Sequence, residues 1–305
     1  MAAINIIDFM GQRKIASILS IFLIMGSIAS FFTKGLALGL DFTGGTQIEV
    51  GYQKKADLKD IRDQLASAGY ENPIVVHFGS EKDVLIRMQG KPAAGLSDNI
   101  LKSLRVSQPT VTLRRVDFVG PQVGEELRED GGLGMLVALL VVMMYIAVRF
   151  QYKFSIGAVI ALMHDVIITI GFFSITGLEF DLTVLAAVLA VIGYSLNDTI
   201  VVSDRIRENL RALRSSEVKT VINQSLTQTL GRTLVTSFTT LLVLSSLFFF
   251  GGELIHNFAI ALMVGVLIGT YSSIYVASNM LLVLSLTREN LIPPEKEGSE
   301  FDERP

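Results

Sequence analysis

The stretch Ile15-Ala-Ser-Ile-Leu-Ser-Ile-Phe-Leu-Ile-Met-Gly-Ser-Ile-Ala-Ser-Phe-Phe32 contains no charged residue and follows directly on Arg13-Lys14. A helix needs about 20 apolar residues to cross the hydrocarbon core of a bilayer. We therefore expect a membrane-spanning helix here, retained because no Ala-x-Ala-like cleavage site follows it. Five further apolar runs of comparable length occupy residues 132–150, 155–176, 182–203, 233–250 and 256–286. The sequence thus predicts an α-helical membrane protein with six transmembrane helices.

Composition agrees with this class and argues against several others. Half of the 305 residues are hydrophobic, mean hydropathy is +0.51, and the net charge of −3 leaves no basic excess for binding nucleic acid. Cysteine is absent, and the three histidines lack the spacing of a zinc site. No nucleophile motif is present. We therefore expect no metal, no cofactor and no enzymatic activity.

The distribution of Lys and Arg predicts the orientation. The connections at 149–154 and 204–232 are rich in Lys and Arg, whereas those at 177–181 and 251–255 carry only acidic charges. The positive-inside rule places the first pair in the cytoplasm, together with both termini. The predicted divisions are 1–33 (N-terminus and first helix), 34–131 (periplasmic domain), 132–286 (helices two to six, with the cytoplasmic loop 204–232) and 287–305 (cytoplasmic tail).

The external segment has the pattern of a small α+β domain. Its apolar residues alternate between strand and helix periodicity in the order β-α-β-β-α-β, which is typical of a ferredoxin-like fold. This fold serves many functions and does not identify one. The expected strands are 46–52, 74–78, 84–88 and 111–118, and the expected helices are 56–68 and 96–104.

Asp198 is the strongest candidate for a functional residue, because a charge at bilayer depth costs at least about 2.5–3.5 kcal/mol. Tyr194 and Ser195 precede it by four and three residues, so the three side chains share one face of helix four. A carboxyl group held between burial and a nearby cation can take up and release protons. The alternative is a structural hydrogen bond between helices.

Arg232 is the expected partner of Asp198. Together with Thr236 and Thr240 it forms a stripe spaced by four residues, which is predicted to line a polar path. Asn197 lies beside Asp198 and is included in this predicted proton pathway. The alternative for Arg232 is an anchor whose charge extends to the interface.

His164 and Asp165 are weaker candidates within helix three. They suit either a proton relay or the packing of helices. Because successive residues on a helix point in different directions, we do not expect the two side chains to face each other, which argues against a catalytic dyad.

The segment Gly39-Leu-Asp-Phe-Thr-Gly-Gly-Thr46 follows the first helix. Paired glycines adopt backbone angles that other residues resist. Asp41, Gly44 and Gly45 are therefore predicted to form either a hinge between the external domain and the membrane or a tight connection between helix and strand.

Together these motifs resemble those of the SecF family, the smaller membrane subunits of the bacterial SecDF protein-export complex. The resemblance covers nearly the whole chain. It is based on the motifs Gly39–Gly45, Val119–Leu127, His164-Asp165, Gly193–Val202 with Asp204–Asn209, and Arg232-Thr233 followed by Thr236–Thr240.

The resemblance implies one six-helix half of an RND-type transporter, with SecD supplying the other half. It also implies proton-driven export of preproteins across the bacterial inner membrane, after or alongside SecYEG and SecA, with YajC or YidC as further partners. The positions of Asp198 and Arg232 match the family's proton-path residues. Two alternatives stay open: an RND-type exporter half for small molecules or lipids, and a non-conducting scaffold of a membrane complex.

Overall fold

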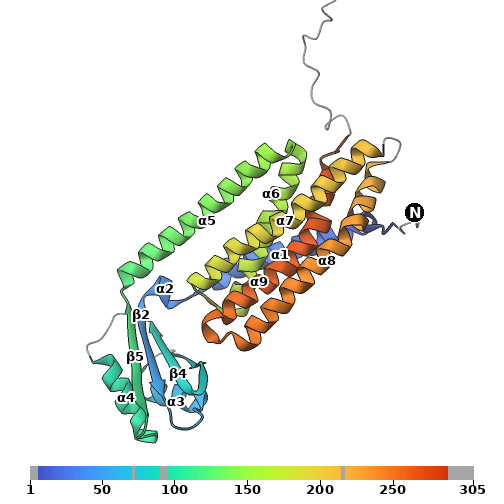
Figure 1. Ribbon diagram of the computed structural model, residues 1–305. Helices are drawn as coiled ribbons and strands as arrows, with labels where there is room; N and C mark the ends of the chain where they lie inside the picture. Colours follow the sequence, from blue (N-terminus) through green and yellow to red (C-terminus); the bar gives the residue numbers. More distant parts are fainter. Residues whose placement is uncertain (1–5, 71–72, 90–94, 214–216, 288–305) are drawn as a thin grey trace, which may run out of the picture.

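The computed structural model describes residues 6–70, 73–89, 95–213 and 217–287. The chain forms a bundle of long helices with a small α+β domain at one end (Figure 1). It enters this outer domain from the first long helix and leaves it through the second. The predicted cytoplasmic tail lies outside the described residues from 288 onward.

The predicted membrane fold is confirmed, since the described residues contain six helices long and apolar enough to cross a bilayer. The last of them consists of α9, a π-helical segment η2 and α10. The helices are α1 (Arg13–Lys34), α5 (Pro121–Arg149), α6 (Tyr152–Thr176), α7 (Leu182–Ala212), α8 (Val218–Phe250), α9 (Glu253–Ser272), η2 (Ser273–Ala277) and α10 (Ser278–Val283).

Three helices extend well beyond their predicted apolar runs. α5 begins at Pro121 and has 29 residues, while α7 and α8 have 31 and 33. At about 1.5 Å per residue each is about 45–50 Å long, compared with a hydrocarbon core of about 30 Å. The segment 204–232, predicted as a loop, is therefore largely helical: α7 continues to Ala212 and α8 resumes at Val218. The residues that follow Asp204 thus continue α7 without a break.

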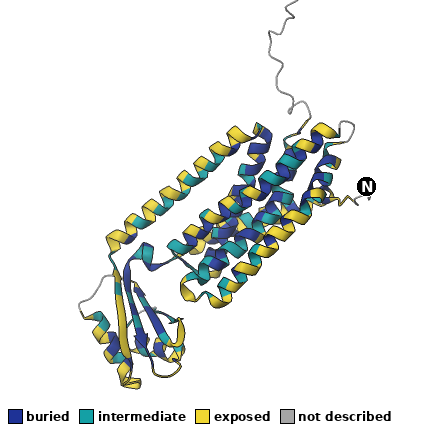
Figure 2. Ribbon diagram, in the orientation of Figure 1, coloured by how far each residue is buried: buried dark blue, intermediate teal, exposed yellow. Residues whose placement is uncertain are grey.

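α6 lies at the centre of the bundle and α5 at its edge, as the burial colours in Figure 2 show. In their most apolar windows, 61% of the α6 residues are buried, compared with 6% of the α5 residues. Small residues permit the closest helix contacts. A Cβ atom at Gly265 of α9 would collide with Val191 of α7, and one at Gly269 would lie 3.1 Å from the Cβ of Ser195. These glycines hold α9 tightly against the face of α7 that carries Ser195.

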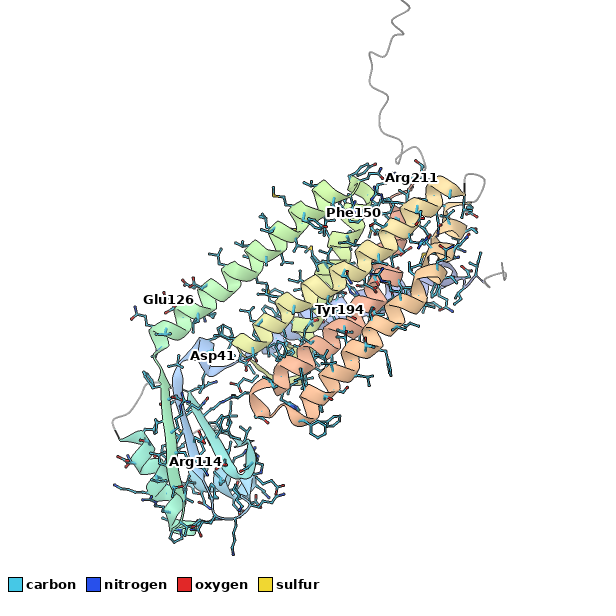
Figure 3. All side chains as sticks on the ribbon, viewed as in Figure 1. Asp41, Arg114, Glu126, Phe150, Tyr194 and Arg211 are labelled. Carbon is cyan, nitrogen blue, oxygen red and sulfur yellow. The ribbon has the colours of Figure 1, made fainter. Side chains whose placement is uncertain are left out.

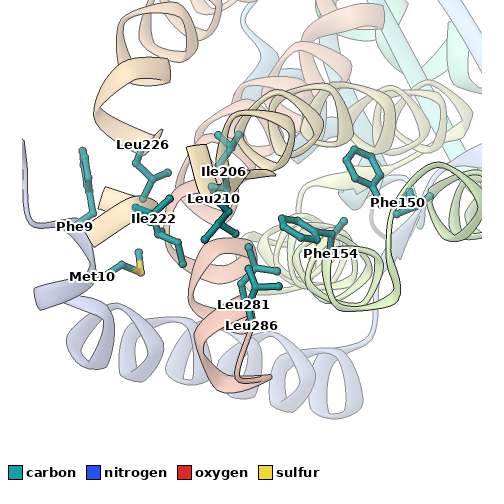
Figure 4. Close-up of a cluster of buried hydrophobic side chains, with 14 residues drawn as sticks. Phe9, Met10, Phe150, Phe154, Ile206, Leu210, Ile222, Leu226, Leu281 and Leu286 are labelled. Atoms are coloured by element: carbon teal, nitrogen blue, oxygen red, sulfur yellow. The ribbon is translucent and has the colours of Figure 1, made fainter. Parts of the chain in front are cut away.

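A hydrophobic cluster closes the end of the bundle opposite the outer domain (Figure 4). The short 3₁₀-helix η1 (Phe9–Gly11) contributes Phe9 and Met10 to it. Asn223 of α8 fixes this segment: its side chain accepts a hydrogen bond from Met10 N at 2.9 Å and donates one to Asp8 at 2.7 Å. The N-terminal segment is therefore packed onto the start of α8.

The outer domain contains the predicted β-α-β-β-α-β order, with helices α3 and α4 packed on one face of a four-stranded antiparallel sheet. The strand order β3-β4-β2-β5 is that of a ferredoxin-like fold. Its core joins Ile48 and Val50 of the sheet to Ile61, Leu65 and Ile100 of the helices. The elements are β2 (Gly45–Gly51), α3 (Leu58–Ser67), β3 (Ile74–Phe78), β4 (Ser80–Gln89), α4 (Leu96–Ser107) and β5 (Thr112–Val119).

The double-glycine segment is packed closely against the start of α5. Gly44 has φ +69° and Gly45 φ +151°, so both adopt conformations that L side chains resist. A Cβ atom at Gly44 would lie 2.8 Å from Pro121 Cα, and one at Gly124 would lie 2.8 Å from Gly44 N. The motif at 39–46 thus fits against the motif at 119–127. This geometry favours the tight connection over a free hinge.

Candidate functional site

Asp165 is completely buried in the middle of α6 and accepts three hydrogen bonds. Its Oδ1 lies 2.8 Å from His164 Nδ1, and its Oδ2 accepts from Ser195 Oγ at 2.5 Å and from Ser272 Oγ at 2.7 Å. The expectation that His164 and Asp165 do not face each other is therefore wrong. Adjacent side chains leave a helix about 100° apart. The side-chain conformations of His164 and Asp165 nevertheless bring Nδ1 and Oδ1 within hydrogen-bonding distance.

His164 connects this carboxylate to α1. Its Nε2 lies 3.2 Å from Ser20 Oγ, which in turn lies 3.1 Å from the hydroxyl of Tyr271. The Tyr271 hydroxyl donates to the carbonyl oxygen of Ala16 at 2.7 Å. A continuous chain of hydrogen-bonding groups thus runs from Asp165 through the bundle to the first helix.

Asp198 is the second buried carboxylate, with 8% of its surface exposed. Its Oδ1 accepts from Thr233 Oγ1 of α8 at 2.7 Å, and its Oδ2 accepts from Ser273 Oγ at 3.0 Å. Asp198 and Ser195 lie one turn apart, so one face of α7 serves both carboxylates. Tyr194 lies near the middle of the bundle (Figure 3), and its hydroxyl donates to Ser237 Oγ at 3.4 Å.

The π-helix begins where the two carboxylates approach the sixth span. Ser272, the last residue of α9, donates to Asp165, while Ser273, the first residue of η2, donates to Asp198. π-turns inside α-helices occur frequently at functional sites. Here the altered turn lies at the position that serves both carboxylates.

Arg232 lies close enough to Asp198 for electrostatic attraction, but among the residues that the structure describes, none of the predicted stripe of Arg232, Thr236 and Thr240 forms a hydrogen bond with it. Arg232 and Thr236 are exposed in the single chain, and Thr240 is partly exposed. Thr236 and Thr240 donate to backbone carbonyls one turn back. Within the described residues, no ion pair joins Arg232 to Asp198. Asn197 is exposed as well.

The side chains of α8 that do face the bundle are Thr229, Thr233 and Ser237, all buried. This stripe has the same four-residue spacing as the predicted one, so the signal for it was present in the sequence. Ser273 had no such signal. No sequence pattern predicts the π-helix, and Ser273 donates to Asp198 from its first position.

The site is suited to proton exchange. A hydroxyl group can donate to a carboxylate and can also accept from a protonated carboxyl group, so either form keeps its hydrogen bonds. Neither carboxylate pairs with a Lys or Arg in the described part of the chain. Among those residues, no three His, Cys, Asp or Glu side chains are grouped in a way that suits a metal ion.

The fold and the site are those of a multi-pass membrane protein with two buried carboxylates, each of which accepts hydrogen bonds from hydroxyl groups inside the helix bundle. Residues 99–287 match the family described as protein export membrane protein SecD/SecF, C-terminal. Residues 29–56 match the SecD/SecF GG motif. The chain belongs to the SecF family of protein translocase subunits.

Similar proteins cover the chain almost completely. It is 51% identical over 304 residues to the protein translocase subunit SecF of Pseudomonas aeruginosa, covering 99% of both chains. It is 50% identical to SecF of Vibrio alginolyticus, covering 98% of this chain and 97% of that one. The crystal structure of SecDF from Thermus thermophilus, a translocon-associated membrane protein, matches with a TM-score of 0.81 and 35% identity. That match covers 93% of this chain, which spans 40% of the SecDF chain.

Proposed function

We propose that this chain is the SecF half of a bacterial SecDF complex that uses the proton motive force to assist preprotein translocation across the inner membrane. The complex acts after or alongside the SecYEG channel and SecA, with YajC or YidC as further partners. The observation that carries this proposal is the pair of buried carboxylates, Asp165 and Asp198, each held by neutral hydroxyl donors from neighbouring helices.

The distribution of basic residues supports the orientation. The helix ends that flank the α5–α6 and α7–α8 connections, together with η1, lie at the end of the bundle opposite the outer domain (Figure 1). Arg149, Lys153, Arg205 and Arg211 lie in or beside these connections. By the positive-inside rule this end is cytoplasmic, and the outer domain is periplasmic.

The exposed polar stripe on α8 supports a partner within the membrane. Arg232 and Thr236 of α8, and Asn197 of the neighbouring α7, are exposed at or near bilayer depth, where contact with lipid is costly for a charge. Each half of an RND-type transporter leaves such a face for the other half. SecD is the partner that covers this face in our proposal, and Arg232 then lies between the two halves.

Proton loading supplies enough energy to move helices. Moving one charge through a motive force of about 150–200 mV supplies about 3.5–4.6 kcal/mol, which is sufficient to shift a two-state equilibrium from disfavoured to favoured. Protonation of Asp198 changes the roles of its hydrogen bonds to α8 and to η2. The relative positions of α7, α8 and the sixth span change with them, and the outer domain responds.

The test uses this chain with SecD in vesicles under an imposed proton gradient. Asp198→Asn keeps the size of the side chain and removes its titration, so we expect loss of both proton flux and gradient-stimulated export. Thr239→Val, at an exposed position of α8 whose hydroxyl bonds only backbone carbonyls of its own helix, is the matched control for a change within the membrane. Flux and export at wild-type levels in Asp198→Asn would overturn the proposal.

A further inference from the structure

Arg87 of the outer domain and Glu179 of the membrane bundle form an ion pair shielded from water. Arg87 Nη1 lies 2.7 Å from Glu179 Oε2, and their side chains are only 12% and 14% exposed. The ion pairs among the described residues of the outer domain are more open: Lys55 with Glu81 at 68% and 65%, Arg115 with Asp117 at 70% and 39%, and Arg114 with Asp83 at 53% and 19%. Arg87 lies on β4, whereas Glu179 is the first residue of β6 (Glu179–Phe180) and lies three residues before Leu182, where α7 begins.

The short segment around Glu179 makes backbone or side-chain contacts with β1, α2 and α9. It pairs in parallel with β1 (Ala37–Leu38), which follows α1, and Gly39 N donates to Phe180 O at 2.8 Å. Asn257 of α9 donates to the carbonyl oxygen of Glu179 at 3.0 Å. Asp41 of the short helix α2 (Leu40–Thr43) accepts from Leu182 N, the first residue of α7, at 3.2 Å. This segment thus joins the outer domain to the outer ends of α7 and α9.

Glu179 is costly to bury, which makes Arg87 important. Burial raises the pKa of the Glu179 carboxyl above its usual range, and nearby Asp181 raises it further, whereas Arg87 opposes both. A buried pair of this kind adds little net stability compared with an apolar pair. Removing one partner, however, leaves an uncompensated buried charge, which is strongly unfavourable. The contact therefore specifies one docked position of the domain.

Rotation at the double glycine does not offer an easy alternative. Gly44 contacts Pro121 and Gly124 closely, so the domain cannot turn there without separating from α5. In contrast, α7 runs without a break from Leu182 to Ala212 and carries Asp198. Asp198 lies about 24 Å along the helix from Leu182 at 1.5 Å per residue. Figure 3 shows Asp41 at the junction between bundle and outer domain, where this helix begins.

We propose that Arg87 and Glu179 grip the outer domain to the start of α7, so that the domain moves as one unit with that end of the helix instead of swinging on flexible linkers. Asp41 strengthens this attachment, because its carboxylate accepts a hydrogen bond from Leu182 N at the start of α7. The driving force for the motion rests on the function proposed above. The mechanical link itself does not, and it can be measured separately.

Because the chain contains no cysteine, two can be introduced for spin labels without competing sites. Val106 on α4 is 85% exposed and Phe250 at the outer end of α8 is 87% exposed, so Val106→Cys and Phe250→Cys report on the position of the domain. The distance distribution is measured on the full chain with SecD in lipid nanodiscs. We expect Arg87→Ala to raise the population of undocked positions on the order of tenfold or more.

Arg115→Ala, which breaks an exposed pair in the same domain, is the matched control and should leave the distribution unchanged. The double variant Arg87→Glu with Glu179→Arg restores an ion pair and should narrow the distance distribution again. This result would separate loss of the ion pair from misfolding. An unchanged distribution in Arg87→Ala overturns the proposal, and so does equal broadening in Arg115→Ala.

Export assays on the same variants separate this inference from the proposed function. Arg87 is far from both carboxylates, so Arg87→Ala should keep proton flux while export falls. If the wild-type complex shows no gradient-driven flux, the proposed function fails, yet the distance measurement still decides whether Arg87 and Glu179 hold the domain.

Discussion

Ser272 and Ser273 are consecutive residues whose hydroxyl groups donate to different carboxylates, Asp165 at 2.7 Å and Asp198 at 3.0 Å. The π-helix begins between them. The two hydroxyl donors are therefore separated by a single peptide bond of the sixth span, and a movement of that bond changes the hydrogen bonding of both acids. In the proposed function, this arrangement would let protonation of one carboxylate alter the hydrogen bonding of the other without direct contact between them.

Replacing Ser273 by alanine removes a single oxygen atom but should shift the pH dependence of proton flux. Ser273→Ala removes one of two hydroxyl donors to Asp198, and a lost hydrogen bond to a buried group costs about 1–3 kcal/mol. Because the lost donor favours the ionised form, the pH dependence of flux should shift to higher pH. Flux is measured in vesicles over a range of pH. Ser155→Ala is the control, since the hydroxyl of this buried serine bonds only backbone carbonyls, at Ile146, Phe150 and Gln151. Identical pH profiles for both variants would contradict the assignment.

Thr233, and not its exposed neighbour Thr236, should be required for transport. Thr233→Val keeps the shape of the side chain but removes the donor to Asp198 Oδ1, whereas Thr236→Val removes only a bond to the backbone of its own helix. We expect Thr233→Val to lower gradient-driven export by about tenfold, the effect of a loss of about 1.4 kcal/mol. Thr236→Val should lower it less than twofold in the same assay. Equal effects would place the functional face of α8 where the sequence predicted it.

Sequence periodicity specified the spacing on α8 but not which face points inward. Arg232, Thr236 and Thr240 repeat every four residues, and so do Thr229, Thr233 and Ser237. In a soluble helix the apolar face identifies the interior, but in a membrane the lipid face is apolar too. Only tertiary packing distinguishes the two stripes. Asp198 itself was predictable because its cost at bilayer depth does not depend on which way α8 turns.

The six helices and the ferredoxin-like order could be predicted because both depend on long, regular apolar patterns. The ends of α7 and α8 could not, since the polar residues beyond the bilayer are compatible with either a helix or a loop. The bond between His164 and Asp165 depends on side-chain conformations, which helical spacing does not determine. The π-turn at Ser273 is a shift of one residue, too small to change the apolar pattern of the sixth span.

Gly44 should tolerate alanine much less well than Gly79 does. Both have φ near +70°, where an L residue is strained by about 1–2 kcal/mol. At Gly79 a Cβ atom would meet nothing within 4 Å, but at Gly44 it would lie 2.8 Å from the backbone of Pro121. Gly79→Ala therefore measures the strain alone, and Gly44→Ala adds the clash. Thermal unfolding of the purified complex should show the larger loss for Gly44→Ala; similar losses would mean that the contact with α5 yields easily.

Tyr52 should make the outer domain sensitive to high pH. Its side chain is 6% exposed, and its hydroxyl has no hydrogen-bond partner among the described residues. Burial raises the pKa of Tyr52 from 10.0 to about 12. Between these values the unfolded domain releases the Tyr52 proton while the folded domain keeps it. The folded state thus binds more protons than the unfolded state, and stability falls as pH rises through this window.

Tyr52→Phe removes both the titration and the unpaired hydroxyl. At neutral pH the variant should be as stable as the wild type or more stable by about 1 kcal/mol, because a buried donor without a partner is unfavourable. Above about pH 10 its stability should decline less steeply than that of the wild type. Urea unfolding followed by circular dichroism measures both effects, with Tyr70→Phe, at a partly exposed position of the same domain, as the control. A destabilised Tyr52→Phe at neutral pH would mean that the hydroxyl is bonded after all, since removing a satisfied group costs stability whereas removing an orphaned one does not.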